Sequence, residues 1–331
     1  MRIPRTWMYV KYFSRLDRKS RISHLLIVTP YLLVESLITK KNLIAELRDF
    51  SRQFRAISLP TTQIQNSVQK PKIEILCVAA GKDLNLLPLV LTQAVETSAN
   101  EVTKITVITR SIDFTTCKEV LEKIDFQTTL EVLDEDKQIS SNLRSQIKEN
   151  FGTRYGWVLQ QFLAVDYIVK SNSAGVLLVN ADTILLREMI WMNEKKEQVL
   201  MASTEFHPPY YQLLAKLIGI PKHPFHTYIT HHMLFQPSVF REIFEYWKIG
   251  TIRDLAYWIF KNSDKDNQSP LCIEFELYAQ GISIIHPEMV ELKKFANTTW
   301  KRNEESLNEV RKIIKTGESP KWNSISLHNY A

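Results

Sequence analysis

The 331-residue sequence predicts an α/β fold, with a mostly parallel sheet flanked by helices and an N-terminal basic helical extension. Two observations predict it. Between residues 73 and 179, short apolar runs alternate with segments of helical periodicity. The composition, 44% hydrophobic and 24% charged, suits a globular chain that buries a large core. We expect a basic helical leader and linker over residues 1–71 and the main domain over residues 72–331.

The leader is the most basic part of the chain, because its first 21 residues hold seven Lys and Arg side chains against one acid, Asp17. Its apolar stretch, residues 23–39, contains Pro30 and Glu35 and is shorter than the roughly 20 residues of a bilayer span. No small-residue cleavage site follows, so a signal peptide is not indicated. Two interpretations stay open for residues 1–39: peripheral contact with anionic lipid at the inner face of the membrane, or a solvated helix packed on its own domain. Between Asp49 and Lys72 the chain is polar without helical periodicity, which predicts a linker.

The main domain begins with strands and helices in alternation. Strands are expected at residues 73–80, 104–110 and 128–136, and helices at residues 85–98 and from about Thr115. A polar helix is expected around residues 138–149. The next helix, residues 156–171, has apolar side chains at positions 158, 162, 165 and 169, which define one face. It leads to a buried strand, Val176 to Val179, which places the following residues at the carboxyl end of a central strand, where ligands of α/β sheets collect.

Asn180 and Asp182 follow that strand directly. Two oxygen-bearing side chains two residues apart point to the same side of an extended chain, so both can approach one hard cation that also holds phosphate oxygens. Such a cation neutralises a diphosphate leaving group by Lewis-acid catalysis. The alternative is that Asp182 only begins a turn.

These motifs carry a resemblance to a known family. The apolar strand that ends in Asn180-Ala181-Asp182, after a helix with Trp157 and Gln161, resembles the nucleotide-sugar-dependent glycosyltransferases of the GT-A fold, whose sheet is Rossmann-type. From about Lys72 onward the chain resembles the bacterial GT-A-like family DUF6492, associated with capsule and surface-polysaccharide biosynthesis. The matching segments are YGWVLQQFLAVDYIV, LLVNADTILL, THHMLFQP, IEFELYAQG and SLHNY. The family's triplet is usually Asp-x-Asp, so Asn180 is a departure that brings no charge to the metal site.

The resemblance implies a metal site and a donor site. Asp182 would contact the metal, with Asn180 beside it and His328 as the late histidine that often completes such a site. Mixed His and carboxylate ligation suits Mn²⁺, with Mg²⁺ as the alternative. The loop after the first strand, with Lys82 and Asp83, would border the nucleotide. Two further residues are candidates for the donor diphosphate because they flank Trp157, namely Arg154 and Gln161.

The acceptor side is expected in two later segments. His231 and His232 precede an apolar run, and neighbouring residues point in different directions, so only one is expected to face a ligand. By resemblance this loop would orient the acceptor sugar. An inverting transferase needs a carboxylate to take the proton of the acceptor hydroxyl. Glu274 and Glu276 are the candidates, with Glu274 preferred; in a helix that follows Ser269-Pro270 the two diverge.

The sequence therefore predicts a glycosyltransferase that moves a sugar from a nucleotide-sugar donor to a saccharide or glycolipid acceptor, at a cytoplasmic location near the membrane. Two alternatives stay open: a non-catalytic nucleotide- or sugar-binding homologue, and a nucleotidyltransferase. The latter is less favoured because no glycine-rich phosphate loop followed by Lys is present early in the domain. Nucleic acid is not expected as a partner, because the net charge of +6 is mild and no aromatic-basic motif accompanies it. Three widely spaced cysteines without a CxxC motif support neither a disulfide framework nor a cysteine zinc site.

Overall fold

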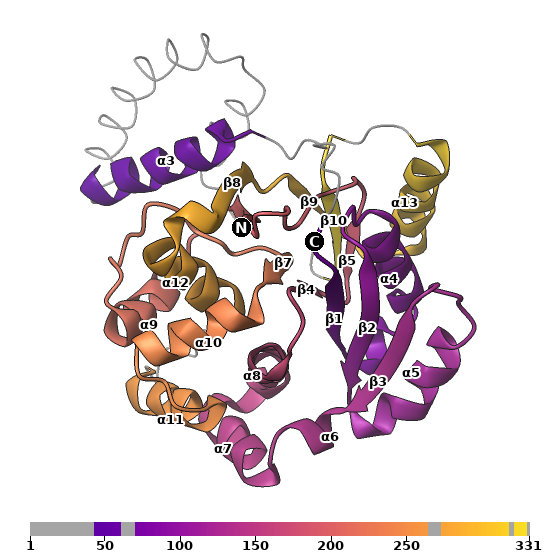
Figure 1. Cartoon of the computed structure of the whole chain (residues 1–331), viewed down its shortest axis with the longest axis horizontal. Coiled ribbons are helices and arrows are strands. Elements are labelled where there is room, and N and C mark those ends of the chain that lie inside the picture. Colours follow the sequence, from indigo (N-terminus) through magenta and orange to yellow (C-terminus); the bar gives the residue numbers. More distant parts are fainter. Residues whose placement is uncertain (1–42, 61–69, 264–272, 318–320, 330–331) are drawn as a thin grey trace.

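The computed structural model describes residues 43–60, 70–263, 273–317 and 321–329 (Figure 1). Among these residues the central element is a five-stranded sheet in the order β3-β2-β1-β4-β7. The strands are β1 (Ile73–Ala79), β2 (Val102–Thr109), β3 (Thr129–Asp134), β4 (Val176–Val179) and β7 (His232–Phe235). β1 to β4 pair in parallel and β7 pairs antiparallel with β4. The predicted α/β class with a mostly parallel sheet is confirmed.

Both faces of this sheet are covered by helices (Figure 1). On one face, Leu76 and Val78 of β1 pack in the same cluster as Phe162 of α8 (Tyr155–Lys170). On the other, Ile75 and Cys77 pack in the cluster that contains α4 (Leu87–Glu96) and α5 (Phe114–Leu121). Alternate residues of a strand point to opposite faces, so a sheet buried on both sides favours a continuous apolar run such as Ile75 to Ala79 of β1.

The later part of the chain surrounds this sheet with helices and two small sheets. Helices on or beside the α8 face are α6 (Glu135–Gln138), α7 (Ser141–Phe151), α9 (Pro208–Ile218), α10 (Pro237–Tyr246), α11 (Ile252–Asn262) and α12 (Tyr278–Ile285), while α13 (Glu304–Thr316) packs in the α4 cluster. A π-helical segment, η4 (Ile273–Leu277), opens α12, so the acidic segment is helical, the case in which Glu274 and Glu276 were expected to diverge. The small sheets are β5-β10-β9 and β6-β8, formed by β5 (Thr183–Leu185), β6 (Gln198–Ala202), β8 (Val290–Lys294), β9 (Asn297–Lys301) and β10 (Ser324–His328).

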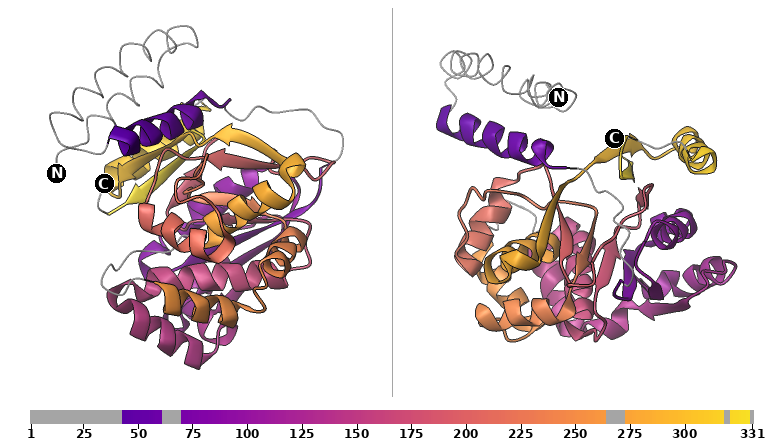
Figure 2. Two further views of the ribbon diagram at one scale, coloured as in Figure 1. Left: turned by 90° about the vertical axis from the view of Figure 1, so that its left-hand side faces the viewer. Right: turned by 45° about the horizontal axis from the view of Figure 1, so that its top comes forward.

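The segment expected as the start of a linker is helical instead. α3 (Leu43–Ser58) runs well past Asp49 and packs against β8 (Figure 2). Phe50 and Ile57, seven residues apart, are buried on one face of this helix, a spacing of about two helical turns. The expected leader contact of residues 1–39 lies outside the described residues. No helix in the described part of the chain has both the length and the apolar character to cross a bilayer.

Candidate functional site

The polar triplet lies at the carboxyl end of β4, beside the start of β7. Val179 pairs with His232 in antiparallel β7, so Asn180, which follows Val179, lies opposite His231, which precedes His232. The backbone N–H of Asn180 donates to the carbonyl oxygen of His231 over 2.9 Å. The amide nitrogen Nδ2 of Asn180 also lies 3.3 Å from Nδ1 of His231. An amide NH₂ only donates, so this ring nitrogen is the acceptor.

The C-terminal strand brings His328 to the same place. β10 pairs antiparallel with β5, with Ser326 opposite Thr183, and the N–H of Leu327 donates to the carbonyl of Asp182 over 2.8 Å. This register sets Nδ1 of His328 3.1 Å from Oδ2 of Asp182, with side chains 10% and 26% exposed. Residues that are 146 positions apart in the chain therefore form a pair that is partly open to solvent.

The electrostatic surroundings favour the ionised form of Asp182. Burial opposes ionisation, but the hydrogen bond from His328 and the charges of His328, His231 and Lys82 together lower the pKa of Asp182 below its ordinary value. For His231 the balance is reversed: burial, together with the charge of His328, lowers its pKa against the opposing effect of Asp182 and Glu205. Asp182 is thus ionised, and the imidazole of His231 favours its neutral form.

Glu205 belongs to this group, although sequence reasoning did not single it out. It lies just after β6, its side chain is 53% exposed, and its Oε2 is 3.6 Å from Nε2 of His207. Burial raises the pKa of Glu205, but the hydrogen bond from His207 and the charges of His231, His207 and His328 outweigh this effect, so the pKa lies below its ordinary value. A signal was present: an apolar run, Val199 to Ala202, is followed by Ser-Thr-Glu, a pattern similar to the one that pointed to Asp182. We refer to Asn180, Asp182, Glu205, His231 and His328 as the strand-end cluster.

The loop after β1 borders this cluster through Lys82. Lys82 is exposed and its charge contributes to the ionisation of Asp182. Asp83, in contrast, is buried and bound by Arg302, whose Nη1 lies 2.6 Å from its Oδ1 and whose Nη2 donates to the carbonyl of Lys82 over 2.7 Å. The backbone N–H of Arg302 donates to the carbonyl of His328. Arg302 therefore ties the Lys82 loop to His328, and the Asp83 carboxylate is engaged in this structural contact.

The two adjacent histidines have different surroundings. His232 is 1% exposed, and its ring packs edge-on against Trp191 with centroids 5.4 Å apart. Its Nε2 lies 3.2 Å from Oγ of Ser324. Burial first, then the charge of His231, lowers its pKa to about 3, so it is neutral in the folded protein. Of the two adjacent histidines, His231 is the member of the strand-end cluster, through its contact with Asn180.

The two glutamates of η4 lie in separate surroundings. Glu276 is fully buried and accepts hydrogen bonds from the Tyr211 hydroxyl (2.6 Å), the backbone N–H of Tyr228 and Nε2 of Gln280 (3.0 Å). These contacts connect α9, α12 and the segment before β7. Glu274 is 8% exposed; burial raises its pKa to about 8, and its Oε2 makes no hydrogen bond within the described residues.

The remaining donor candidates lie at the start of α8. The guanidinium of Arg154 lies over the Trp157 ring, 4.9 Å from its centroid. Gln161 is 1% exposed, and its Oε1 accepts from the backbone N–H of Ile273 over 3.0 Å. Gln161 therefore holds the start of η4 to α8.

A cavity of about 450 Å³ lies at the opposite edge of the sheet, between the end of α8 and the start of α11. It is lined by Val165, Asp166, Val169, Lys170, Phe244, Gly250, Thr251, Ile252 and Arg253. The Asp166 carboxylate is paired with Lys170 over 2.6 Å, and most of the lining is apolar. We place the candidate site at the strand-end cluster, because its polar side chains converge at the carboxyl end of a central strand, whereas Asp166 and Lys170 of the cavity are paired with each other.

The donor set at the strand-end cluster suits a cation that shares its coordination with a ligand. No group of three His, Cys, Asp or Glu side chains in the described ranges is arranged to hold a metal ion alone. Asp182 Oδ2 and His328 Nδ1 are 3.1 Å apart, so both atoms would contact one cation if it replaced the hydrogen bond between them and Nδ1 gave up its proton. Cations of the Mg²⁺ type are commonly bound through one or two protein side chains plus substrate phosphates. The residues therefore fit a cation that binds together with a phosphate ligand.

Three solved structures similar to this chain are glycosyltransferases. The apo form of mouse xyloside xylosyltransferase 1 matches with 10% identity and a TM-score of 0.40, over 77% of this chain and 97% of that chain. An active-site mutant of LgtC matches with 10% identity and a TM-score of 0.46, over 77% of this chain and 86% of that chain. The apo bifunctional glycosyltransferase WbbM matches with 9% identity and a TM-score of 0.42, over 81% of this chain and 47% of that chain. No family model and no curated protein matches the chain, so the resemblance to DUF6492 stays a prediction.

Proposed function

We propose that the protein is a glycosyltransferase that moves a sugar from a nucleotide-sugar donor to a saccharide or glycolipid acceptor. The observation that carries the proposal is the Asp182–His328 pair at the carboxyl end of β4, with Lys82 and Glu205 beside it. The Asp182–His328 pair and the Lys82 ammonium suit a phosphate-bearing leaving group. The Glu205 carboxylate suits an acceptor hydroxyl that gives up its proton.

The donor half of the site would be formed by Asp182, His328 and Asn180, which would hold Mn²⁺ or Mg²⁺. When bound, the cation neutralises the charge of the departing nucleoside diphosphate. Lys82 would bind a phosphate oxygen from the loop after β1, where its ammonium contributes a charge-assisted hydrogen bond. Arg154 stays a prediction for the diphosphate, while Asp83 and Gln161 would support the site through Arg302 and Ile273.

The acceptor half would be formed by His231 and a carboxylate. Nδ1 of His231 accepts from Asn180, which leaves Nε2–H as a donor toward an acceptor hydroxyl. For an inverting transfer we propose Glu205 as the base, because its side chain is half exposed, it lies beside the cluster, and neighbouring histidines favour its ionised form. Glu274, the sequence-based choice, is buried with a pKa of about 8, and Glu276 is engaged by three donors.

The cellular role follows from the sequence resemblance and is likewise a proposal. A bacterial enzyme of surface-polysaccharide or capsule biosynthesis would act in the cytoplasm, at the inner face of the membrane, on a growing saccharide or glycolipid. The basic leader of residues 1–39 would supply the peripheral membrane contact.

The test is a thermal-shift titration with a panel of nucleoside diphosphates and nucleotide sugars, with and without manganese. Wild type should be stabilised by one nucleotide in a manganese-dependent way, because a ligand that binds only the folded state raises its stability. Asp182→Ala should lose the manganese-dependent part, and Glu149→Ala, an exposed acid on α7, should keep it. Equal behaviour of Asp182→Ala and wild type would reject a metal-dependent donor site.

The products of turnover separate the proposed function from its alternatives. Free nucleoside diphosphate together with a glycosylated acceptor indicates sugar transfer. Pyrophosphate indicates nucleotidyl transfer, and tight nucleotide binding without turnover indicates a binding protein.

A further inference from the structure

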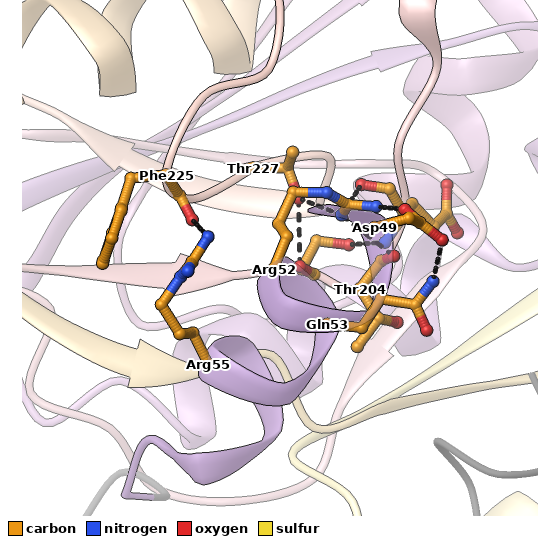
Figure 3. A network of polar contacts seen from close by, with 9 residues as sticks. Asp49, Arg52, Gln53, Arg55, Thr204, Phe225 and Thr227 are labelled. Carbon is orange, nitrogen blue, oxygen red and sulfur yellow. Dashed lines mark hydrogen bonds and ion pairs between the residues drawn. The ribbon is translucent and has the colours of Figure 1, made fainter. Parts of the chain in front are cut away.

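α3 is anchored to the segment that carries Glu205. The Arg52 side chain is only 4% exposed, and its Nη1 donates to the carbonyl oxygens of Thr204 (3.3 Å) and Glu205 (3.2 Å) (Figure 3). Its Nη2 is paired with Asp49 one turn earlier in α3, and Oδ2 of Asp49 accepts from Gln53 over 2.6 Å. Contacts within α3 therefore hold the Arg52 guanidinium in the orientation in which it contacts residues 204 and 205.

The rest of the segment is held by the same guanidinium and by Thr227. Arg52 Cζ lies 4.6 Å from the centroid of the Phe206 ring, and Nη1 lies 3.4 Å from Oγ1 of Thr227. The N–H of Ser203 donates to the carbonyl of Thr227 (2.8 Å), and Oγ1 of Thr227 donates to the carbonyl of Ser203 (3.0 Å). A planar guanidinium that donates in its plane and stacks on an aromatic ring fixes both the position and the tilt of what it contacts.

We propose that Arg52 is a positioning residue that holds residues 203–207, and thereby the Glu205 carboxylate, at the strand-end cluster. The proposal rests on the proposed function for its catalytic meaning, but its structural part is independent of it. Two carbonyls that flank the Cα of Glu205 are satisfied by one buried side chain, so the direction of the Glu205 side chain depends on a helix that precedes the main domain. α3 is accordingly part of the site, and not only a tether to the leader.

Arg55 provides a matched control on the same helix. Its guanidinium lies 3.8 Å from the centroid of Phe225 and donates to the carbonyl of Phe225 over 3.3 Å (Figure 3). Arg55 therefore also docks α3 through an aromatic ring and a carbonyl, but these contacts are with Phe225 and not with residues 203–207. A general loosening of α3 should follow from either substitution, whereas loss of position at residues 203–207 should follow only from substitution of Arg52.

The experiment uses the full chain as wild type, Arg52→Met, Arg52→Lys and Arg55→Met, and measures hydrogen–deuterium exchange. In Arg52→Met, the peptide that contains residues 203–207 should exchange about tenfold faster. The arginine contacts are absent in this variant, so the free energy needed to open the segment locally is lower. Arg52→Lys should give a smaller increase in exchange rate. An ammonium can donate to one of the carbonyl oxygens, but it lacks the several in-plane donors of a guanidinium and does not stack on the Phe206 ring. Arg55→Met should leave this peptide within about twofold of wild type. If Arg52→Met does not fold, Arg52→Lys against Arg55→Met provides the same comparison.

Turnover then tests the role of Glu205. In Arg52→Met the kcat of sugar transfer should fall by about 10- to 100-fold, the scale of a misplaced reacting group, while manganese-dependent binding of nucleoside diphosphate is retained. Combining Arg52→Met with Glu205→Gln should reduce kcat no further than Glu205→Gln alone, since both changes remove one function. Unchanged exchange in both Arg52 variants, an equal rise in Arg55→Met, or additive losses in the double variant would overturn the proposal. If wild type transfers no sugar, the proposed function fails, and the exchange measurements alone decide whether Arg52 positions the segment.

Discussion

The buried carboxyl of Glu274 makes the stability of this protein depend on pH in a direction that can be worked out. Burial raises its pKa from 4.5 to about 8, so between these values the folded state binds more protons than the unfolded chain. The contribution of this group is therefore fully favourable below pH 4.5 and is lost as pH rises toward 8. At about 1.4 kcal/mol per pKa unit, ionisation of Glu274 in the unfolded chain costs wild type roughly 4 kcal/mol of stability at pH 8.

Glu274→Gln removes this titration while it keeps the shape of the side chain. Urea unfolding of both proteins should show similar stability at about pH 5 and a gap in favour of the variant that widens by roughly 3 kcal/mol at about pH 8. Any constant cost of placing an amide there cancels in the difference between the two pH values. A gap that does not widen would mean that the carboxylate is hydrated or paired in solution, which would refute the argument from burial.

Glu276→Gln is the control for this measurement. The pKa of Glu276 is raised by burial to about 6, against the opposing effect of its donors, so its pH-dependent part should end near pH 6. Because Gln replaces an acceptor of Tyr211, Tyr228 and Gln280, this variant should lose stability at every pH, by about 1–3 kcal/mol. The same pair of variants also tests catalysis: if Glu205 is the base, Glu274→Gln should keep its sugar transfer.

Three further outcomes are expected. Arg302→Met leaves the buried Asp83 carboxylate without its partner and should cost about 3 kcal/mol in urea unfolding, whereas Arg311→Met, in an exposed pair, should change stability by less than about 0.5 kcal/mol. Lys82→Ala should weaken nucleoside diphosphate binding by about tenfold, with a reduced dependence on salt in calorimetric titrations, because a phosphate contact is lost. His232→Phe removes an imidazole whose pKa is lowered from 6.5 to about 3; wild type should lose stability relative to this variant as pH falls below 6.5, by roughly 2 kcal/mol at about pH 5, in urea unfolding at several pH values.

The sequence predicted those parts of the fold that depend on local pattern. The apolar run of Ile75 to Ala79 is typical of a strand buried on two faces, and the alternation that follows it predicts a parallel sheet. The position of Asp182 followed from the same reasoning, since the carboxyl end of a central strand is fixed by the strand itself. α3 was missed at its C-terminal half because Phe50 and Ile57 are separated by charged residues that made the segment look like a linker.

The parts of the site that could not be predicted depend on pairing between distant strands. His328 meets Asp182 only because β10 pairs with β5 in one register; a shift by one residue would turn His328 to the other face of the strand. The resemblance to a known family supplied that residue, and local pattern did not. Glu205 reaches the cluster through contacts with α3 and Thr227 that no short stretch of sequence encodes.

The departure at Asn180 is consistent with its surroundings. Nδ2 of Asn180 donates to Nδ1 of His231, and burial lowers the pKa of His231, so the ring is neutral and needs a donor at that nitrogen. An aspartate at this position would have no proton to give, so Nδ1 of the neutral ring would have to carry the proton and donate it, which would leave Nε2 as an acceptor. The amide therefore costs the site one negative charge but keeps His231 in the tautomer whose Nε2–H is free to meet a hydroxyl. Since His328 and Lys82 favour the ionised form of Asp182, the proposed site keeps a carboxylate for a cation beside β4, while the imidazole of His231 stays neutral.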